Sequence, residues 1–138
     1  MRKKIQFLNN DNIEFLQGIN ISHENQIKAK FLRKSLAVIV KKHPEIEGSL
    51  RGQGLNQGIA CGIEGLAQEI CLVAKENGLF VETSGVNNEV IKIMPVHTLD
   101  IYGLEKSLEI LRDCINSSQI QLIIRQHNSA KMPELASF

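Results

Sequence analysis

The sequence predicts a single α+β domain, in which helices pack on one face of a small, mainly antiparallel sheet. Apolar residues recur at intervals of three and four near 24–42, 64–77 and 101–116, which is the period of amphipathic helices. Between these stretches, residues 49–61 and 79–94 are rich in short β-type runs broken by glycine and asparagine. The order of helix, two strands, helix, two strands and helix is typical of an α+β sandwich.

The helix boundaries follow from capping and stop residues. The first helix is expected to begin after Ser22, which is a good N-cap residue, and to end before Pro44. Gly78 is expected to end the second helix, and Asp100 to cap the third. The third helix has the clearest pattern, with apolar residues at Ile101, Leu104, Leu108, Leu111 and Ile115.

The strands are expected in two pairs. In the first pair, residues 49–51 and 55–61 are separated by a Gly-Gln-Gly turn. In the second pair, residues 79–82 and 90–94 are joined by a loop whose glycine and paired asparagines favour a turn. We therefore expect both pairs to belong to one sheet.

The chain divides into three segments. Residues 1–21 are interpreted as an N-terminal lead-in, residues 22–117 as the domain, and residues 118–138 as an extension. Within the extension, residues 120–124 fit either a continued helix or a strand. Residues 126–138 have the composition of a disordered end, so the extension is expected to be partly disordered.

Composition excludes several classes of function. The 138 residues include 16 basic and 15 acidic side chains, and the net charge of +1 gives no broad attraction to nucleic acid or to a membrane surface. The N-terminus has no apolar run of signal-peptide length, and the sequence nowhere has 18 consecutive apolar residues. We therefore expect a cytoplasmic protein.

Neither the cysteines nor the histidines form a recognisable chemical motif. Three widely spaced cysteines, each within an apolar or helical pattern, indicate buried free thiols rather than disulfides or a zinc site. The four histidines are scattered without metal-binding spacing, so no metal site is expected. No nucleophile and base can be combined into a catalytic group, and no catalytic residue is assigned.

Arg51 is the first candidate binding residue. It precedes Gly52 and Gly54, which permit positive φ and close approach of the backbone. Its guanidinium can bind a carboxylate or phosphate through two hydrogen bonds. The alternative is that Arg51 pairs with a structural carboxylate and that the glycines only turn the chain.

Lys92 and the hydroxyls of Thr83 and Ser84 are the other candidates. Alternation along a strand places Lys92 on the face opposite Ile91 and Ile93, where a cation need not be buried unless an anion meets it. The alternative is an ordinary exposed lysine. The two hydroxyls can orient a substrate, although a Thr-Ser-Gly turn forms equally well without a ligand.

Three pieces of sequence resemble a known family. They are RGQGLNQGIA at residues 51–60, VETSG at 81–85 and EVIKIMP at 89–95. In this order and spacing they resemble the small C-terminal domain of the subgroup-III aminotransferases that use pyridoxal phosphate, in particular those of the diaminobutyrate type. The resemblance extends over about residues 13–117.

The resemblance implies a function and a set of binding residues. It places Lys92 where the substrate carboxylate is bound, and it makes Arg51, Thr83 and Ser84 further substrate-binding residues. The reaction it implies is amino transfer between diaminobutyrate with glutamate and the semialdehyde with 2-oxoglutarate. The sequence departs from the family after Pro95, where Val96 and His97 replace Pro-Leu.

The family's pyridoxal phosphate and the lysine that binds it belong to a large domain that precedes this segment. Because only residues 1–21 precede the first expected helix, we expect the chain to lack that domain, to bind no cofactor alone and to be inactive alone. A large-domain chain or a homodimer partner would complete the enzyme. The alternative function, outside the enzymes, is a free-standing small α+β module that binds a partner protein or an amino acid.

Overall fold

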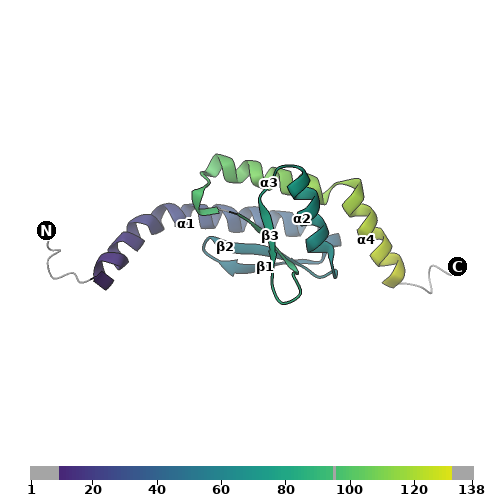
Figure 1. Ribbon diagram of the computed structural model, residues 1–138, viewed down its shortest axis with the longest axis horizontal. Helices are drawn as coiled ribbons and strands as arrows, with labels where there is room; N and C mark the ends of the chain where they lie inside the picture. The colour runs from purple at the N-terminus through teal and green to yellow at the C-terminus, as the bar shows by residue number, and fades with distance from the viewer. Residues whose placement is uncertain (1–9, 95, 132–138) are drawn as a thin grey trace.

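The expected alternation of helices and strand pairs is confirmed by a computed structural model (Figure 1). The structure describes the backbone of residues 10–94 and 96–131, and the side chains of residues 23–94, 96 and 98–130. The helices are α1 (Asn10–Lys42), α2 (Leu66–Glu76), α3 (Ile101–Ile115) and α4 (Ser118–Lys131), and the strands are β1 (Gly48–Gln53), β2 (Asn56–Cys61), β3 (Val81–Ser84) and β4 (Val90–Ile93). Short 3₁₀ turns cover Pro44–Ile46 and Val96–Thr98.

The four strands form one antiparallel sheet, as the sequence predicted, and their order is β1-β2-β4-β3. β1 and β2 are joined by a two-residue connection that begins with Gly54, whose φ of +61° suits a hairpin turn. β2 pairs with β4 at the centre of the sheet, where Ile59 lies opposite Ile91. The pairing of two hairpins through β2 and β4 therefore gives the sheet its order.

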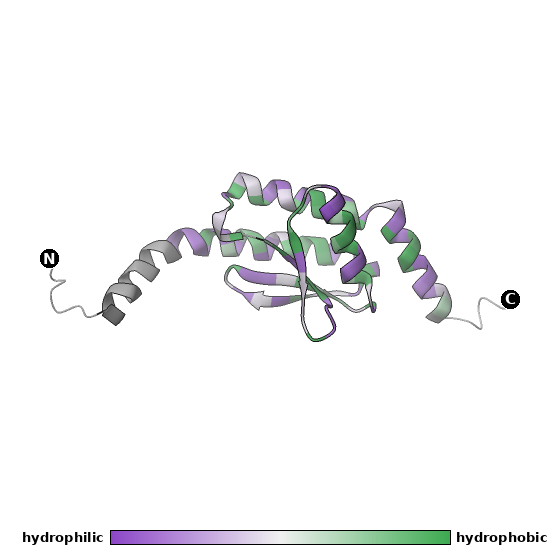
Figure 2. Ribbon diagram, in the orientation of Figure 1, coloured by the Kyte–Doolittle hydropathy of each residue, from purple (hydrophilic) through white to green (hydrophobic). Residues whose placement is uncertain are grey.

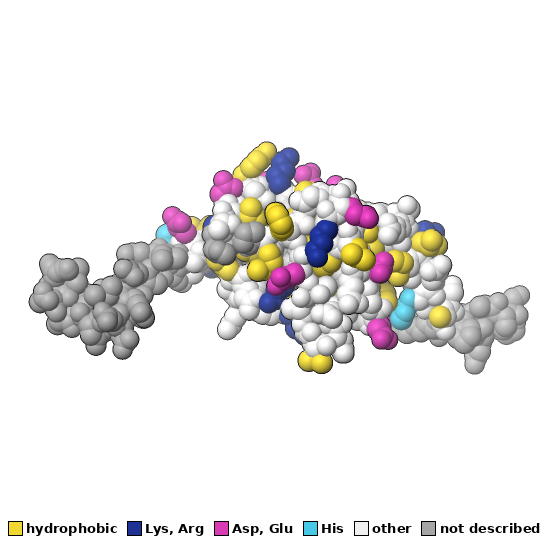
Figure 3. All heavy atoms as spheres, in the orientation of Figure 1, with side chains coloured by type: hydrophobic (Ala, Val, Ile, Leu, Met, Phe, Trp, Pro, Cys, Tyr) yellow, Lys and Arg dark blue, Asp and Glu magenta, His cyan; other side chains and the backbone are white. Residues whose placement is uncertain are grey.

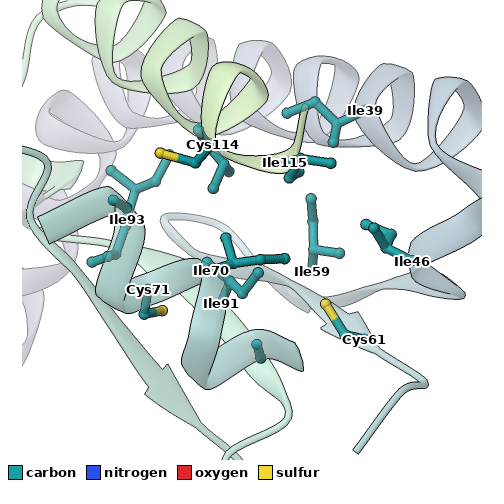
Figure 4. Packing of buried hydrophobic residues seen from close by; sticks show 14 of the residues in the cluster. Ile39, Ile46, Ile59, Cys61, Ile70, Cys71, Ile91, Ile93, Cys114 and Ile115 are labelled. Carbon is teal, nitrogen blue, oxygen red and sulfur yellow. The ribbon is translucent and has the colours of Figure 1, made fainter. Parts of the chain in front are cut away.

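One face of the sheet is covered by the helices. Ile59, Ile91 and Ile93 point from the sheet into a core that also contains Ile70 of α2 and Ile115 of α3 (Figure 4). Each of these five side chains is at most 4% exposed. Colouring by hydropathy shows a largely apolar α2, alternating apolar and polar stretches along α3, and a largely hydrophilic β1 (Figure 2). The helix-covered core thus fixes which strand residues face inward and which face away.

The first helix begins earlier than expected. It starts at Asn10 rather than after Ser22, and Figure 1 shows its first half extending away from the sheet. Asparagine and aspartate favour the start of a helix, so the polar residues before Ile13 fit this position. A single serine costs only about 0.5 kcal/mol inside a helix, so Ser22 does not interrupt it. The division of the chain at residue 21 remains a prediction.

The extension after residue 117 is also more ordered than expected. Residues 118–131 form α4, so the choice between helix and strand at residues 120–124 is settled as helix, and the expected disorder is wrong as far as Lys131. Ile120 and Ile124, one helical turn apart, are at most 2% exposed and belong to the core. Their burial anchors the first turns of α4, and the helix continues through residues 126–131, whose composition suggested disorder. Residues 132–138 lie outside the described residues.

The cysteines are buried free thiols, as expected. Cys61, Cys71 and Cys114 are at most 5% exposed and form no disulfide. Burial raises the pKa of Cys61 to about 12 and that of Cys71 to about 11, and it also raises the pKa of Cys114. Thiols with such high pKa values are poor nucleophiles, so their role is packing.

The described residues contain neither a membrane-spanning helix nor a cluster of metal-binding side chains. None of their helices combines the length and the apolar character needed to cross a membrane. Nor do three or more metal-binding side chains cluster among them.

The centre of the sheet depends on a glycine in β2, which leads to a first prediction. A Cβ atom at Gly58 would lie 2.4 Å from the carbonyl oxygen of Ile91 in β4. We expect Gly58→Ala to lower the free energy of unfolding by about 1–3 kcal/mol, because the strands must move apart. Urea titration measures this change. Gln53→Ala, at an exposed position of the same sheet, should stay within about 0.5 kcal/mol of the parent. Equal stability of Gly58→Ala and the parent would contradict the close approach of the strands.

Candidate functional site

The face of the sheet opposite the helices carries most of the candidate residues. Because Ile91 faces the helices, its neighbour Lys92 points to the other face, as the alternation predicted. Ser84 lies opposite Val90, which also faces away from the helices, whereas Thr83 lies opposite Ile91. Thr83 and Ser84 therefore belong to different faces of the sheet.

Three of the four sequence-predicted residues meet at one hollow on this face. The hollow has a volume of about 180 Å³ and is lined by Arg51, Gly52, Asn56, Ser84, Gly85, Val90 and Lys92. Thr83 is not brought to it. Thr83 lines a separate hollow beside Lys75 and donates a 3.3 Å hydrogen bond to the Asn88 side chain. The structure thus brings together Arg51, Ser84 and Lys92 and leaves Thr83 apart.

Arg51 and Gly52 lie in β1 at the edge of this hollow, so the turn covers Gly54 and Leu55 rather than the expected residues 52–54. Gly52 has a φ of +84° and Gly54 a φ of +61°, as the sequence indicated. A Cβ atom at Gly52 would lie only 1.9 Å from the carbonyl oxygen of Asn56. Glycine is therefore required at residue 52 both by its backbone conformation and by the space available.

Arg51 is paired within the chain. Its Nη1 lies 3.5 Å from Oε2 of Glu89, and its side chain is 53% exposed. The other carboxylate oxygen of Glu89 accepts a 3.0 Å hydrogen bond from the backbone N–H of Asn87. These contacts favour the alternative in which Arg51 meets a structural carboxylate.

Lys92 has a different kind of partner. Its ammonium donates a hydrogen bond to the Asn56 side-chain oxygen, which is neutral. Among the described side chains, no carboxylate oxygen lies within 4.0 Å of the Lys92 ammonium. Glu82 lies directly across on β3 without forming an ion pair with it. Lys92 is therefore the cation of this hollow whose charge is not neutralised.

Asn56 and Glu89 are the residues that sequence reasoning missed. Alternation along β2 puts Asn56 on the same face as Gly58, so its position was accessible from the sequence. Glu89 precedes β4 and meets a residue 38 positions away, and no local pattern indicates such a contact. Both partners lie within the recognised pieces, residues 51–60 and 89–95, but neither was singled out as a binding residue.

A larger hollow of about 660 Å³ lies next to this one. It is lined by residues from the end of β2, the start of α2 and the loop before β4: Cys61, Gly62, Glu64, Gly65, Gln68, Asn87, Asn88 and Glu89. Its side chains are mainly amides and carboxylates. On the face shown in Figure 3, basic and acidic side chains are interspersed rather than separated.

The Arg51–Glu89 contact generates a second prediction. Hydrogen bonds from the backbone amides of Glu89 and Asn87 lower the pKa of the Glu89 carboxyl most, and Arg51 lowers it further. Because the pKa is lowered in the folded chain, the pair stabilises the fold above the ordinary glutamate pKa, and this contribution is lost as the pH falls through the lower folded value. We expect Arg51→Met to raise the pKa of Glu89 only part of the way to its ordinary value, as followed by an NMR titration of the carboxyl carbon. Lys34→Met, on the exposed side of α1, should leave it unchanged. An ordinary pKa for Glu89 in the parent would contradict the described contacts.

Comparison with known proteins shows that this chain is similar to one part of several larger enzymes. No family model matches the chain. The diaminobutyrate–2-oxoglutarate transaminase of Oceanobacillus iheyensis is 45% identical over 80 residues, which cover 58% of this chain and 19% of that protein. The enzyme of the same name from Halalkalibacterium halodurans is 40% identical over 105 residues, covering 76% of this chain and 25% of that protein. The enzyme of the same name from Marinococcus halophilus is 42% identical over 90 residues, which cover 65% of this chain and 21% of that protein.

The fold also matches that of an aminotransferase. The crystal structure of acetylornithine aminotransferase from Elizabethkingia anophelis superposes with a TM-score of 0.61 and 20% sequence identity. The match covers 75% of this chain and 27% of that chain. The chain thus spans between a fifth and a quarter of the length of the curated relatives it matches. The resemblance is confirmed: the chain is similar in sequence to one part of the diaminobutyrate–2-oxoglutarate transaminases and shares its fold with part of an aminotransferase.

Proposed function

We propose that the chain is the small-domain part of a pyridoxal-phosphate-dependent aminotransferase of the diaminobutyrate type. The observation that carries this proposal is the 40–45% identity to three diaminobutyrate–2-oxoglutarate transaminases. The reaction is amino transfer between diaminobutyrate with glutamate and the corresponding semialdehyde with 2-oxoglutarate. A cytoplasmic location, and a large-domain chain or a homodimer partner, are parts of the same proposal.

Within such an enzyme this chain supplies carboxylate contacts. Each of the amino acids and the 2-oxo acid in the reaction carries at least one carboxylate. Lys92 offers an ammonium with no anionic partner among the described residues, and Ser84 adds a hydroxyl to the same hollow. A hydrogen bond to a charged group contributes about 1.5–3 kcal/mol. Arg51 has a supporting role in this proposal, because Glu89 already binds it.

The described residues do not fit pyridoxal phosphate. Covalent attachment needs a lysine held in an enclosed site against the cofactor's carbonyl carbon. Of the lysines at the hollows described above, Lys75 is exposed on α2, and Lys92 lines a hollow of 180 Å³, which is smaller than the roughly 300–1,000 Å³ of ligand pockets. No step of the reaction is therefore assigned to this chain beyond substrate binding.

A third prediction concerns the 138-residue chain alone. Mixed with pyridoxal phosphate, it should give no protein-bound absorbance band, and it should not transfer amino groups from diaminobutyrate to 2-oxoglutarate, because no described lysine lies in a cofactor site. A full-length diaminobutyrate transaminase is the positive control for both measurements. Turnover by the pure chain that is abolished by changing one lysine would overturn this expectation.

A fourth prediction tests Lys92 in a working enzyme. The segment is grafted in place of its counterpart in a full-length diaminobutyrate transaminase, and Lys92→Met is compared with the parent graft. The Michaelis constants for glutamate and 2-oxoglutarate should rise by roughly one to two decades, since a charge-assisted contact is lost. Thermal stability should stay within about 0.5 kcal/mol, as at other surface sites.

Lys106→Met is the matched control for this graft. Lys106 is exposed on α3, where it lies over the Tyr102 ring. Its replacement by methionine should leave both Michaelis constants unchanged. Unchanged kinetics in Lys92→Met would make Lys92 an ordinary exposed lysine. A large loss of stability would make it a structural residue.

A further inference from the structure

The two cations of the hollow differ in the charge of their partners. Arg51 meets the Glu89 carboxylate, whereas Lys92 meets the Asn56 amide. We propose that Asn56 is a positioning residue, which holds the Lys92 ammonium at the hollow without neutralising it, so that Lys92 can bind a carboxylate. This inference deepens the proposed function and rests on it.

Asn56 is held firmly enough to position a side chain. It is the first residue of β2 and pairs with Gln53 at the end of β1. Its carbonyl oxygen lies so close to Gly52 that no side chain fits between them. The next residue, Gln57, is 5% exposed and donates hydrogen bonds to the carbonyl oxygens of Ala29 in α1, at 3.1 Å, and Gly54, at 2.6 Å. The backbone at Asn56 is thus fixed by the hairpin and by α1.

The path of the Lys92 side chain is fixed as well. Lys92 extends from β4, and its Cγ lies 3.1 Å from the place where a Cβ atom of Gly58 would be. Gly58 and Asn56 are two positions apart in β2 and therefore share a face of the sheet. The absence of a side chain at Gly58 lets the lysine lie over β2 and reach Asn56.

The neutrality of Asn56 is the decisive property. A lysine ammonium has three N–H donors, and the amide oxygen of Asn56 occupies one of them, so the others are left for an anion. Because Glu89 offsets the charge of Arg51, Lys92 supplies the remaining positive charge of the hollow. An aspartate at residue 56 has nearly the same shape, but it would form an ion pair with Lys92 and remove that charge.

The experiment compares binding of 2-oxoglutarate by the 138-residue chain and its variants. Binding is followed by NMR chemical shifts in ¹⁵N-labelled protein. In the parent, the signals are the Asn56 side-chain amide and the Lys92 backbone amide. In the variants, the signal is the backbone amide at residue 92. We expect saturable shifts in the parent that weaken as NaCl is added. Asn56→Asp should weaken binding by roughly tenfold or more, as for the loss of a charge-assisted contact, and Asn56→Ala should weaken it less. Asn128→Asp, the same change at an exposed position of α4, should bind like the parent.

The outcomes separate this inference from the proposed function. If Lys92→Met abolishes binding but Asn56→Asp binds like the parent, the role of Asn56 is wrong and that of Lys92 stands. If Lys92→Met binds like the parent, both are overturned. If the parent shows no saturable shift, the inference about Asn56 is overturned, and the role of Lys92 in the proposed function is decided by the graft. A backbone amide spectrum of Asn56→Asp that matches the parent outside the hollow shows that the variant folds. If its spectrum shows unfolding, Asn56 is a structural residue and the inference is overturned.

Discussion

The pairing of β2 with β4 is the constraint on which both the core and the hollow depend. It joins two hairpins that are separated by α2 in the sequence, and it sets Ile59 against Ile91 on the helix-covered face. The same register places Gly58 and Lys92 on the opposite face. A shift by one residue would turn the isoleucines outward and the lysine into the core, which is prohibitively unfavourable. The apolar core therefore determines the position of the cation.

Much of this arrangement could be predicted from the sequence, because it follows from local periodicity. Ile91 and Ile93 alternate with Lys92, and this pattern alone gives the face of the lysine. The same rule separates neighbours in a strand, so Thr83 and Ser84 cannot both face one hollow. The sequence prediction placed both hydroxyls at one binding site, and in this respect it differs from the structure.

The parts that could not be predicted depend on contacts between distant residues. Ile120 and Ile124 are followed by a mostly polar stretch from residue 125, and the burial of both in the core attaches α4 to the domain. Gln121 strengthens this attachment by donating to the Glu45 carboxylate, at 3.2 Å, and to the Ile115 carbonyl, at 2.8 Å. In the same way, the contact of Arg51 with Glu89 spans 38 positions, and only the folded sheet brings the two together.

The contrast between Arg51 and Lys92 explains how two cations on one face can have different roles. A guanidinium has several donors in a fixed plane and suits contact with a carboxylate, as Arg51 has with Glu89. An ammonium is a compact charge on a flexible stem, and a neutral amide can orient it without cancelling it. At about 180 Å³ the hollow is smaller than the roughly 300–1,000 Å³ of typical ligand pockets. In the proposed enzyme, the remaining walls of the substrate site must therefore come from outside the described residues. The relatives, of which this chain matches a fifth to a quarter, have the additional length to provide them.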